Sequence, residues 1–419
     1  MEVLNSVDTL LSNARKASKV IAAQTIAKRD EVLRYLSEAL RDNIQEIIVE
    51  NQKDLALMPD SDPKKDRLLL NEQRIYQLAD SINDIIALED PTGKSAYSHT
   101  LKNGLTIEKK IVPLGVVGVI YESRPNVTID IAALCIKSGN SAVLRGGSDA
   151  WHSNSILVKI ISQALQKAGL AADIVTLYPP DRALVTTLLE ADRMVDIIIP
   201  RGSAGLIDFV RKNSKIPTIE TGAGVCHTYV SKHGDLDMAA SIVINAKTTR
   251  PSVCNSLDTI LADKEIVEDL CQKMAEGMAN YKVEIFADPV AHEALSQLAY
   301  PFLSHAEEED YGREFLDFKC SIKTVSGIEE AMDHIEKYSS RHSEAIITND
   351  KEEIDTFIQG VDAAAVYANA STRFTDGGEF GLGAEIGIST QKLHARGPFA
   401  LEKLTTEKWV AVGSGQIRI

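Results

Sequence analysis

The sequence predicts an α/β fold with two α/β domains and, in addition, a β-hairpin and a C-terminal strand that serve oligomerisation. Three observations lead to this prediction. At 419 residues the chain is too long for one ordinary hydrophobic core. Short apolar strands alternate with helical segments in two separate stretches, which is typical of parallel sheets with right-handed crossovers. A hairpin signal and a strand-like tail lie outside both stretches.

Residues 1 to about 92 are predicted to form helices that cover another layer, because apolar residues recur there at helical spacing. Next, Asn103–Gly104 separates two alternating runs within His99–Val112. This predicts a hairpin with a type I′ turn, which needs a positive φ at both positions. The tail segments Trp409–Val412 and Gln416–Ile419 also resemble strands. Hairpin and tail either join subunits by strand addition or fold back on their own domain.

The first alternation predicts a parallel sheet of the dinucleotide-binding type. Its predicted strands are Gly115–Tyr121, Ser141–Leu144, Ile174–Tyr178, Val195–Ile199 and Thr218–Glu220. Its predicted helices are Ile129–Ser138, Asn154–Ala168, Arg182–Ala191 and Ala204–Arg211.

The second alternation predicts another α/β domain. Its predicted strands are Leu257–Leu261, Lys282–Phe286, Lys319–Val325, Glu344–Ile347 and Ala364–Tyr367. Its predicted helices are Leu236–Thr248, Glu265–Glu276, Ile328–Lys337 and Glu352–Gln359. The acidic segment Glu307–Asp310 is expected to be a solvated loop, and the glycine-rich segment 376–383 a lid or a crossing between domains.

The composition excludes several classes of protein. A net charge of -15 argues against surfaces for nucleic acid or anionic membranes, and it requires a local cluster of cations for any anionic ligand. No apolar run is long enough to span a membrane, and no signal peptide is visible at the N-terminus. The 5 cysteines include no C-x-x-C pair, which favours a reducing cytosol. The expected location is therefore the cytoplasm.

Two glycine turns at strand ends are candidate sites for a dinucleotide. They are Leu144–Ser148 and Pro200–Gly205, each with an arginine at the strand end. Neither matches G-x-G-x-x-G, so turns that serve packing alone are an equal alternative. The arginines favour an anion, and an arginine at either strand end could hold the 2′-phosphate of NADP.

Cys254 is the candidate nucleophile. It lies in the polar turn Arg250–Ser256 between a predicted helix and a predicted strand, whereas a structural cysteine usually lies in an apolar run. Lys247 is nearby, and positive charge favours the reactive thiolate. Glu220 at a strand end beside Thr221–Gly224 is a candidate cleft carboxylate or an ordinary loop residue.

Two other groupings are weaker candidates. Cys226 and His227 are adjacent, and neighbours on a strand point to opposite faces, so they make a poor nucleophile–base pair. His334, His342 and Glu344 invite a zinc hypothesis, but their spacing fits no known closed site, and no metal is predicted.

Taken in order, these pieces resemble the aldehyde dehydrogenase superfamily over essentially the whole chain. The resemblance is strongest to the members that reduce L-glutamyl 5-phosphate in proline biosynthesis. Its segments are 113–126 (PLGVVGVIYESRPN), 142–147 (AVLRGG), 199–203 (IPRGS), 219–224 (IETGAG), 245–255 (NAKTTRPSVCN) and 325–346, which includes Ala331, His334, Ile335, Tyr338 and His342–Glu344.

The resemblance implies roles for several residues. Cys254 is at the position of the nucleophile and Glu220 at that of the base that activates water in hydrolytic relatives. Arg145 and Glu314 are at the positions of cofactor-ribose ligands, with Gly146, Gly202 and Ser203 in the cofactor-binding turns. The superfamily's Pro-Trp-Asn-Phe-Pro is replaced by Ser123–Val127, so Asn126 is offset by about two positions from the usual oxyanion donor. The backbone N–H of Cys254 is the other candidate donor.

The implied reaction is the NADPH-dependent reduction of L-glutamyl 5-phosphate to L-glutamate 5-semialdehyde and phosphate through a cysteine thioester. Arg124, Lys247, Arg250 and Asn255 are expected to hold the substrate and its phosphate, or to form surface ion pairs instead. The reaction needs no water, so Glu220 is expected to matter less than in hydrolytic relatives. A hydrolytic aldehyde dehydrogenase and a non-catalytic dinucleotide-binding scaffold are the alternatives.

The resemblance also implies an organisation. The predicted cofactor-binding domain comprises residues 1–95, 114–225 and 368–395, and the catalytic domain comprises 226–367. Residues 96–113 and 396–419 are the predicted oligomerisation hairpin and tail. A homo-oligomer of two or more subunits is expected. Glutamate 5-kinase, which makes the acyl phosphate, is a candidate partner.

Overall fold

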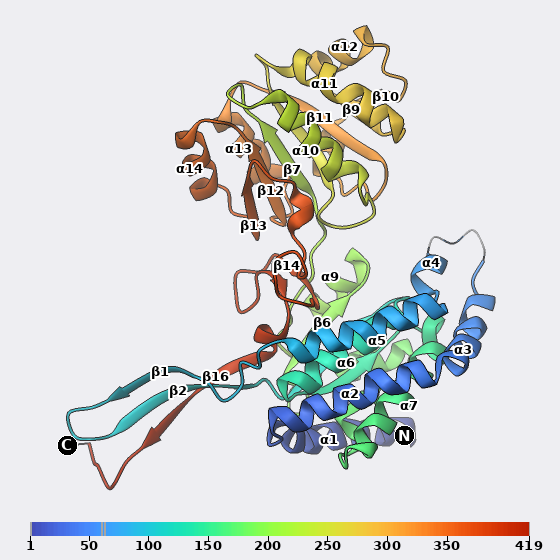
Figure 1. Ribbon diagram of the computed structural model, residues 1–419, viewed down its shortest axis with the longest axis vertical. Helices are drawn as coiled ribbons and strands as arrows, with labels where there is room; N and C mark the ends of the chain where they lie inside the picture. Colours follow the sequence, from blue (N-terminus) through green and yellow to red (C-terminus); the bar gives the residue numbers. More distant parts are fainter. Residues whose placement is uncertain (1, 60–61, 63, 419) are drawn as a thin grey trace. The chain divides into compact units, whose positions relative to one another are not determined.

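The computed structural model describes residues 2–59, 62 and 64–418. They pack into two compact units, which Figure 1 shows with their elements labelled. The first unit comprises residues 1–221, 381–387 and 399–419. The second comprises residues 222–380 and 388–398. No helix among the described residues is both long and apolar enough to cross a bilayer.

Helices form most of the first unit, as predicted for its N-terminal part. They are α1 Glu2–Ala22, α2 Ile26–Asp42, α3 Ile44–Ala56, α4 Lys64–Leu68, α5 Glu72–Ala87, α6 Pro125–Ser138, α7 Trp151–Lys167, α8 Val185–Leu189 and α9 Ala204–Asn213. Helix α2 packs on α5, α6 and α7, and its apolar face is fully buried there. The helix predicted over Arg182–Ala191 is shorter, because its first turn is a 3₁₀ helix, Arg182–Leu184.

A four-stranded parallel sheet lies at the centre of the first unit, in the order β5-β4-β3-β6. Its strands are β3 Val116–Tyr121, β4 Ser141–Arg145, β5 Val175–Leu177 and β6 Ile197–Arg201. The predicted strand Thr218–Glu220 is wrong, since only Thr218 forms a bridge, to Ile198. The chain proceeds outward from β3 to β4 and β5 and then returns to place β6 on the other side of β3. This reversal puts a topological switch point between β3 and β6.

The hairpin prediction is confirmed, but its turn differs. Strands β1 Ser95–Thr100 and β2 Thr106–Pro113 pair antiparallel. Only Gly104 of the predicted Asn103–Gly104 pair has a positive φ, of 83°. The loop is therefore a longer turn with one left-handed glycine and not a type I′ turn.

The tail folds back on its own chain. Strand β16 Thr405–Val412 pairs antiparallel with β2, which gives the three-stranded sheet β1-β2-β16. The second predicted tail strand is wrong for residues 416–418, which have no strand structure, and Ile419 lies outside the described residues.

The second unit is built on a seven-stranded parallel sheet in the order β10-β9-β11-β8-β7-β12-β13. Its strands are β7 Cys226–Val230, β8 Leu257–Asp263, β9 Glu284–Ala287, β10 Leu303–His305, β11 Lys319–Val325, β12 Ser343–Ile347 and β13 Ala365–Ala368. Its helices are α10 Leu236–Thr248, α11 Val267–Asn280, α12 Pro289–Gln297, α13 Ile328–Tyr338 and α14 Lys351–Gly360.

This unit contains elements that the sequence patterns missed. Helix α12 and strands β7 and β10 were not among the predicted elements, nor were the short strands β14 Gly387–Ser389 and β15 Gly397–Phe399. The predicted acidic loop at Glu307–Asp310 is wrong, because Glu308–Gly312 forms a 3₁₀ helix closed by a capping box. Strands β10, β14 and β15 have 3 residues each, too few for a periodicity to show.

Candidate active site

The candidate nucleophile lies in the turn that joins α10 to β8. Pro251 cannot continue the helix, and the backbone turns through Cys254 to Ser256, whose N–H donates to the carbonyl of Val253 at 3.0 Å. Cys254 is half-buried, whereas Cys135, Cys226, Cys271 and Cys320 are buried. Burial raises the pKa of all four of these other thiols. Cys254 is therefore the cysteine that a substrate can reach.

Gly224 packs directly against this turn. A Cβ atom at residue 224 would overlap the backbone of Cys254, including its carbonyl oxygen. Only glycine therefore allows the two segments to approach this closely. The Gly224 N–H donates to Oε1 of Glu314 at 2.8 Å. Burial raises the pKa of Glu314, and the bond from Gly224 opposes that rise. The predicted cofactor ligand Glu314 is thus already tied to the loop that supports the nucleophile.

Cys226 contacts the backbone of the nucleophile. Its thiol donates to the carbonyl oxygen of Cys254 at 3.2 Å, and His342 Nδ1 lies 3.9 Å from the same sulfur. His227, next in the chain, pairs on the opposite side of the strand with Glu344, 3.1 Å from its Nδ1. The two neighbours therefore have separate partners, and they do not form a nucleophile–base pair.

Asn255 anchors the other side of the turn. Its amide nitrogen donates to the carbonyl of Thr375 at 2.9 Å and to that of Arg373 at 3.3 Å. Its amide oxygen accepts a hydrogen bond from the Arg373 guanidinium, and its backbone carbonyl accepts one from Thr372 at 2.8 Å. The side chain of Asn255 is therefore buried, and both its amide nitrogen and its amide oxygen have protein partners.

Lys247 does not lie where the sequence analysis expected it. Its side chain is fully buried, its ammonium lies 3.6 Å from Asp258, and it donates to the carbonyl of Asp317 at 3.1 Å. Burial raises the pKa of Asp258 to about 7, and Lys247 opposes the rise. The expectation that Lys247 meets the substrate's phosphate is corrected accordingly, because a buried lysine with two protein partners presents no free charge. Arg250 is exposed.

The predicted cofactor residues of the first unit lie at the carboxyl end of its parallel sheet. Arg145 ends β4, is 8% exposed and donates to the carbonyl of Pro180 at 2.7 Å, while its Nε is buried without a partner among the described residues. A Cβ at Gly146 would overlap the side chain of Asn154. A dinucleotide phosphate needs this combination of a cation and close backbone approach.

The neighbouring strand end offers a helix N-terminus. Ser203 caps α9 by accepting from Leu206, and both Gly202 and Ser203 are exposed. Glu122, at the end of β3, accepts from the Ser203 N–H at 2.9 Å. These groups lie at the switch point between β3 and β6, where parallel sheets bind nucleotides.

Asn126 lies on a helix rather than in a loop. Helix α6 begins at Pro125, earlier than the predicted Ile129, because proline is well suited to the first helical position. Asn126 Nδ2 donates to Asp130 Oδ2 at 3.2 Å, one turn along α6. Burial raises the pKa of Asp130 to about 6. Arg124 is at the N-cap position of this helix, without a capping hydrogen bond from its side chain, and Ser123 before it has a positive φ of 38°.

The other candidates are placed as follows. Glu220 is half-buried in the first unit, with Thr218 Oγ1 at 3.5 Å from its carboxylate. His334 and His342 are buried, and burial lowers their pKa values to about 3 and about 4. Among the described residues, no three His, Cys, Asp or Glu side chains are grouped to hold a metal ion.

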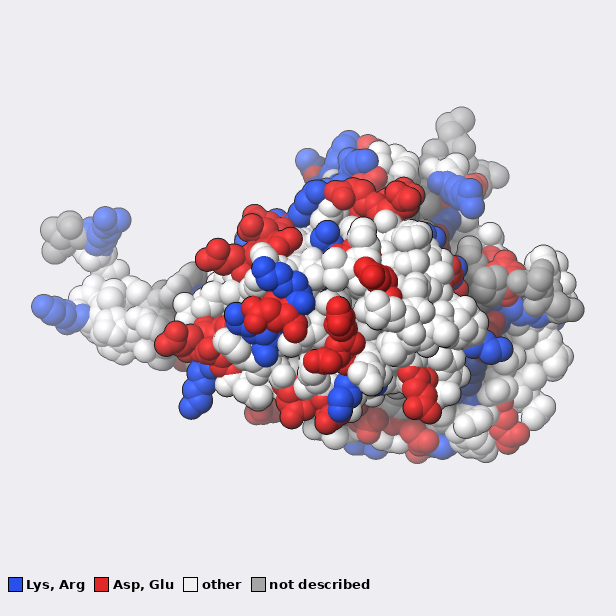
Figure 2. All heavy atoms as spheres, turned by 90° about the horizontal axis from the view of Figure 1, so that it is seen from above, with Lys and Arg blue, Asp and Glu red and all other residues white. Residues whose placement is uncertain are grey.

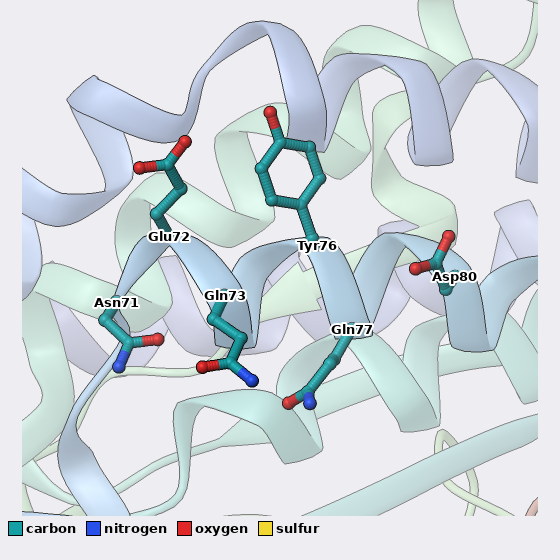
Figure 3. Close-up of a pocket in the computed structure, with 6 residues that line it drawn as sticks. All are labelled: Asn71, Glu72, Gln73, Tyr76, Gln77 and Asp80. Atoms are coloured by element: carbon teal, nitrogen blue, oxygen red, sulfur yellow. The ribbon is translucent and has the colours of Figure 1, made fainter.

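A solvent-open hollow on the first unit contains none of these residues (Figure 3). Helix α5 and its N-cap supply its lining, from Asn71, Glu72, Gln73, Tyr76, Gln77 and Asp80. The functional candidates therefore lie at strand ends and in the Cys254 turn, and not in this hollow.

Sequence reasoning did not foresee the contacts of three residues with predicted ones. Arg373 and Cys226 hold the Cys254 turn, and Asp130 holds Asn126. The spacing of Asn126 and Asp130 could have revealed their pairing once the helix start was known. No local pattern links Arg373 to Asn255, 118 residues away.

Comparison with known proteins identifies the family. Residues 4–294 match the model of the aldehyde dehydrogenase family. A gamma-glutamyl phosphate reductase of Legionella pneumophila (strain Paris) is 53% identical over 407 residues, which cover 97% of each chain. One of Chlorobium phaeobacteroides (strain BS1) is 51% identical over 97% of this chain and 98% of its own. The crystal structure of gamma-glutamyl phosphate reductase from Thermotoga maritima has a TM-score of 0.94 and 39% identity, covering 99% of this chain and 100% of that one. The chain therefore belongs to the aldehyde dehydrogenase family and, within it, to the gamma-glutamyl phosphate reductases.

Proposed function

We propose that this protein reduces L-glutamyl 5-phosphate to L-glutamate 5-semialdehyde and phosphate with NADPH, as a step of L-proline biosynthesis. The observation that carries the proposal is near-full-length identity of about one half to gamma-glutamyl phosphate reductases, in a chain whose one accessible cysteine is Cys254 among the described residues.

Cys254 supplies the nucleophile. Its thiolate attacks the acyl carbon, the bond to the phosphate oxygen breaks, and a thioester remains on the sulfur. The negative charge that develops on the acyl oxygen needs hydrogen-bond donors, each worth about 3 kcal/mol. The backbone N–H of Cys254 and the amide of Asn126 are the two candidates. Asn126 donates one of its two amide N–H groups to Asp130, and the amide has a second N–H for an acyl oxygen.

The first unit's strand ends suit the cofactor. The unpartnered Nε of buried Arg145 and the close approach at Gly146 and Gly202 match a phosphate-bearing dinucleotide, with Ser203 at the N-terminus of α9. We assign Arg145 to the 2′-phosphate and Glu314 to a ribose. When bound, NADPH supplies the hydride that reduces the thioester.

Glu220 has a lesser role in this scheme. Hydride transfer to the thioester needs no water, and hydrolysis would waste the activated substrate. The leaving phosphate instead needs cations, for which we propose Arg124 and Arg250. Lys247 is not one of these cations, because its ammonium lies beside Asp258 in the interior.

The reverse reaction tests this proposal. With L-glutamate 5-semialdehyde and NADP⁺, turnover should require inorganic phosphate and should be much slower with NAD⁺. Phosphate-independent formation of glutamate would instead indicate a hydrolytic aldehyde dehydrogenase. Cys254→Ala should abolish turnover, while Cys271→Ala, at a buried cysteine of α11, should leave it unchanged. Glu220→Gln should keep substantial activity, and a complete loss of activity would show that Glu220 is essential to the reaction.

We also propose that the protein works in the cytoplasm as a homo-oligomer. The absence of disulfides among the described cysteines supports the first point. For the second, Tyr97 of β1 and Trp409 of β16 are 49% and 62% exposed and pack edge to face at 5.8 Å on the three-stranded sheet. Trp409→Glu should lower the mass measured by sedimentation.

Glutamate 5-kinase stays a candidate partner, to be tested by co-sedimentation.

A further inference from the structure

Arg373 lies next to the candidate nucleophile although it is distant in sequence. It sits in the 3₁₀ helix Thr372–Phe374, and its guanidinium donates from Nη1 to the amide oxygen of Asn255, the residue that follows Cys254. Two further hydrogen bonds from Asn255 to the carbonyls of Arg373 and Thr375 fix the segment against the turn. The cation is therefore held at the nucleophile by a buried, fully bonded neighbour.

The guanidinium of Arg373 is only partly satisfied by the protein. Its Nε is buried and has no hydrogen-bond partner among the described residues. Arginine cannot lose its charge to relieve this, so an unpaired buried donor is costly unless a ligand supplies an acceptor. Burial lowers the pKa of Arg373, and the next largest cause is the positive charge of Arg250.

Arg250 supplies a second charge at the start of the Cys254 turn, Arg250–Ser256, and its positive charge acts on Arg373. It is exposed. Asp376 favours the charged form of Arg373, but its Oδ1 already accepts the N–H of Gly378 at 2.8 Å. Two like charges kept close together are unfavourable unless an anion joins them.

The surrounding charge makes such a pair unusual. The chain has a net charge of -15, and Figure 2 shows Asp and Glu side chains spread over the visible face, with Lys and Arg set between them. A substrate with anionic groups meets general repulsion and needs cations placed where it binds.

We propose that Arg373 and Arg250 form an anion subsite beside Cys254 that binds an oxyanion group of the substrate. The proposal rests on the proposed function, whose substrate has two groups of this chemistry, the phosphoryl group and the α-carboxylate. The planar guanidinium offers parallel N–H donors that match either group.

Kinetics of the reverse reaction test the subsite and identify its ligand. Arg373→Ala and Arg250→Ala should each raise one KM by about ten- to a hundredfold, the loss of a charge-assisted hydrogen bond. A rise confined to the KM for phosphate identifies the phosphoryl group. A rise confined to the KM for the semialdehyde identifies the carboxylate. Arg373→Lys should recover part of the loss, and Arg341→Ala, which removes an exposed charge paired with Asp362, should change neither KM.

Alkylation of Cys254 by iodoacetamide gives a readout without turnover. Inorganic phosphate or L-glutamate should slow alkylation of the wild type, and Arg373→Ala should lose the protection given by one of them. If both KM values and the protection are unchanged, the subsite is overturned. If instead kcat falls and unprotected alkylation changes with both KM values constant, Arg373 only positions the turn and the proposal also fails. A wild type without phosphate-dependent turnover defeats the proposed function itself, whereas an active wild type with unaltered variants defeats the subsite alone.

Discussion

The two candidate sites depend on different kinds of structure. At the carboxyl end of the first unit's sheet, Gly202 and Ser203 are exposed, and a cap formed by Ser203 itself orders them. In the second unit, Cys254 is held by buried partners, among them Gly224 and Cys226. The difference teaches that the cofactor edge is suited to binding, whereas the nucleophile turn is suited to rigid placement. Mutations should therefore mainly change affinity in the first unit and turnover in the second.

The strongest test of this comparison is Gly224→Ala. The new methyl group would overlap the Cys254 backbone, so the turn must move, at a cost of about 1–3 kcal/mol in stability. A displaced nucleophile should lower kcat by about a hundredfold. Gly205→Ala is the matched control, because a Cβ at that position has no neighbour within 4 Å. Equal kcat values for the two variants would show that the close contact is unimportant.

The next largest effect is expected for Arg145→Ala at the cofactor edge. Loss of one charge-assisted contact to the 2′-phosphate should raise the KM for NADPH by about ten- to a hundredfold. The KM for NADH and the free energy of unfolding should change little. Arg41→Ala, which removes an exposed arginine paired with Asp80, is the control. A fall in kcat at saturating NADPH would contradict the expectation that mutations in the first unit mainly change affinity.

A smaller effect is expected for Cys226→Ala. It removes the thiol that donates to the Cys254 carbonyl, a bond worth about 1 kcal/mol. Because burial keeps the pKa of this thiol well above its usual value, the donor is present throughout the neutral range. We expect a fall in kcat of about two- to tenfold, partial recovery in Cys226→Ser and no change in Cys271→Ala. The variants should be compared by steady-state kinetics and by iodoacetamide labelling of Cys254, and identical labelling rates would rule out the anchor.

The smallest effect concerns stability in acid. Acidification should lower the free energy of unfolding through a group in the second unit and raise it through a group in the first. Burial lowers the pKa of His342 to about 4, below the 6.5 of an exposed histidine. Its neutral form fits the fold, so stability is lost as the pH falls below about 6.5, by at most about 1.4 kcal/mol per pH unit. Asp130 behaves in the opposite way. Its pKa of about 6 lies above the ordinary 3.8, so acidification between these values stabilises the fold.

Urea unfolding at pH 7 and pH 5 measures this difference. His342→Gln should reduce the loss of stability at pH 5, and Asp130→Asn should increase it. Because the two changes act on groups in separate units, their effects should add. If the free energy of unfolding of both variants changes between pH 7 and pH 5 by the same amount as that of the wild type, neither group contributes.

Much of the fold could be predicted from the sequence because it depends on short-range patterns. Strands β3 and β8 are long enough to show as apolar runs. Helices α10 and α13 are long enough to show a helical spacing of apolar residues. The hairpin was found because glycine at residue 104 is needed for a positive φ. The errors lie at ends and in short pieces. Helix α6 begins at Pro125, before the predicted start at Ile129. Within Thr218–Glu220, where a strand was predicted, only one bridge forms.

By itself the sequence determined the chemistry of this protein: which cysteine lies in a polar turn, which strands end in glycine and arginine, and which family these segments resemble. Those are properties of residues close together in the chain. Tertiary structure alone decided the partners. It buried Lys247 against Asp258, placed Cys226 under the Cys254 carbonyl, and brought Arg373 to Asn255. Such pairings follow from how strands and loops far apart in sequence pack, and a buried group takes the partner that this packing supplies.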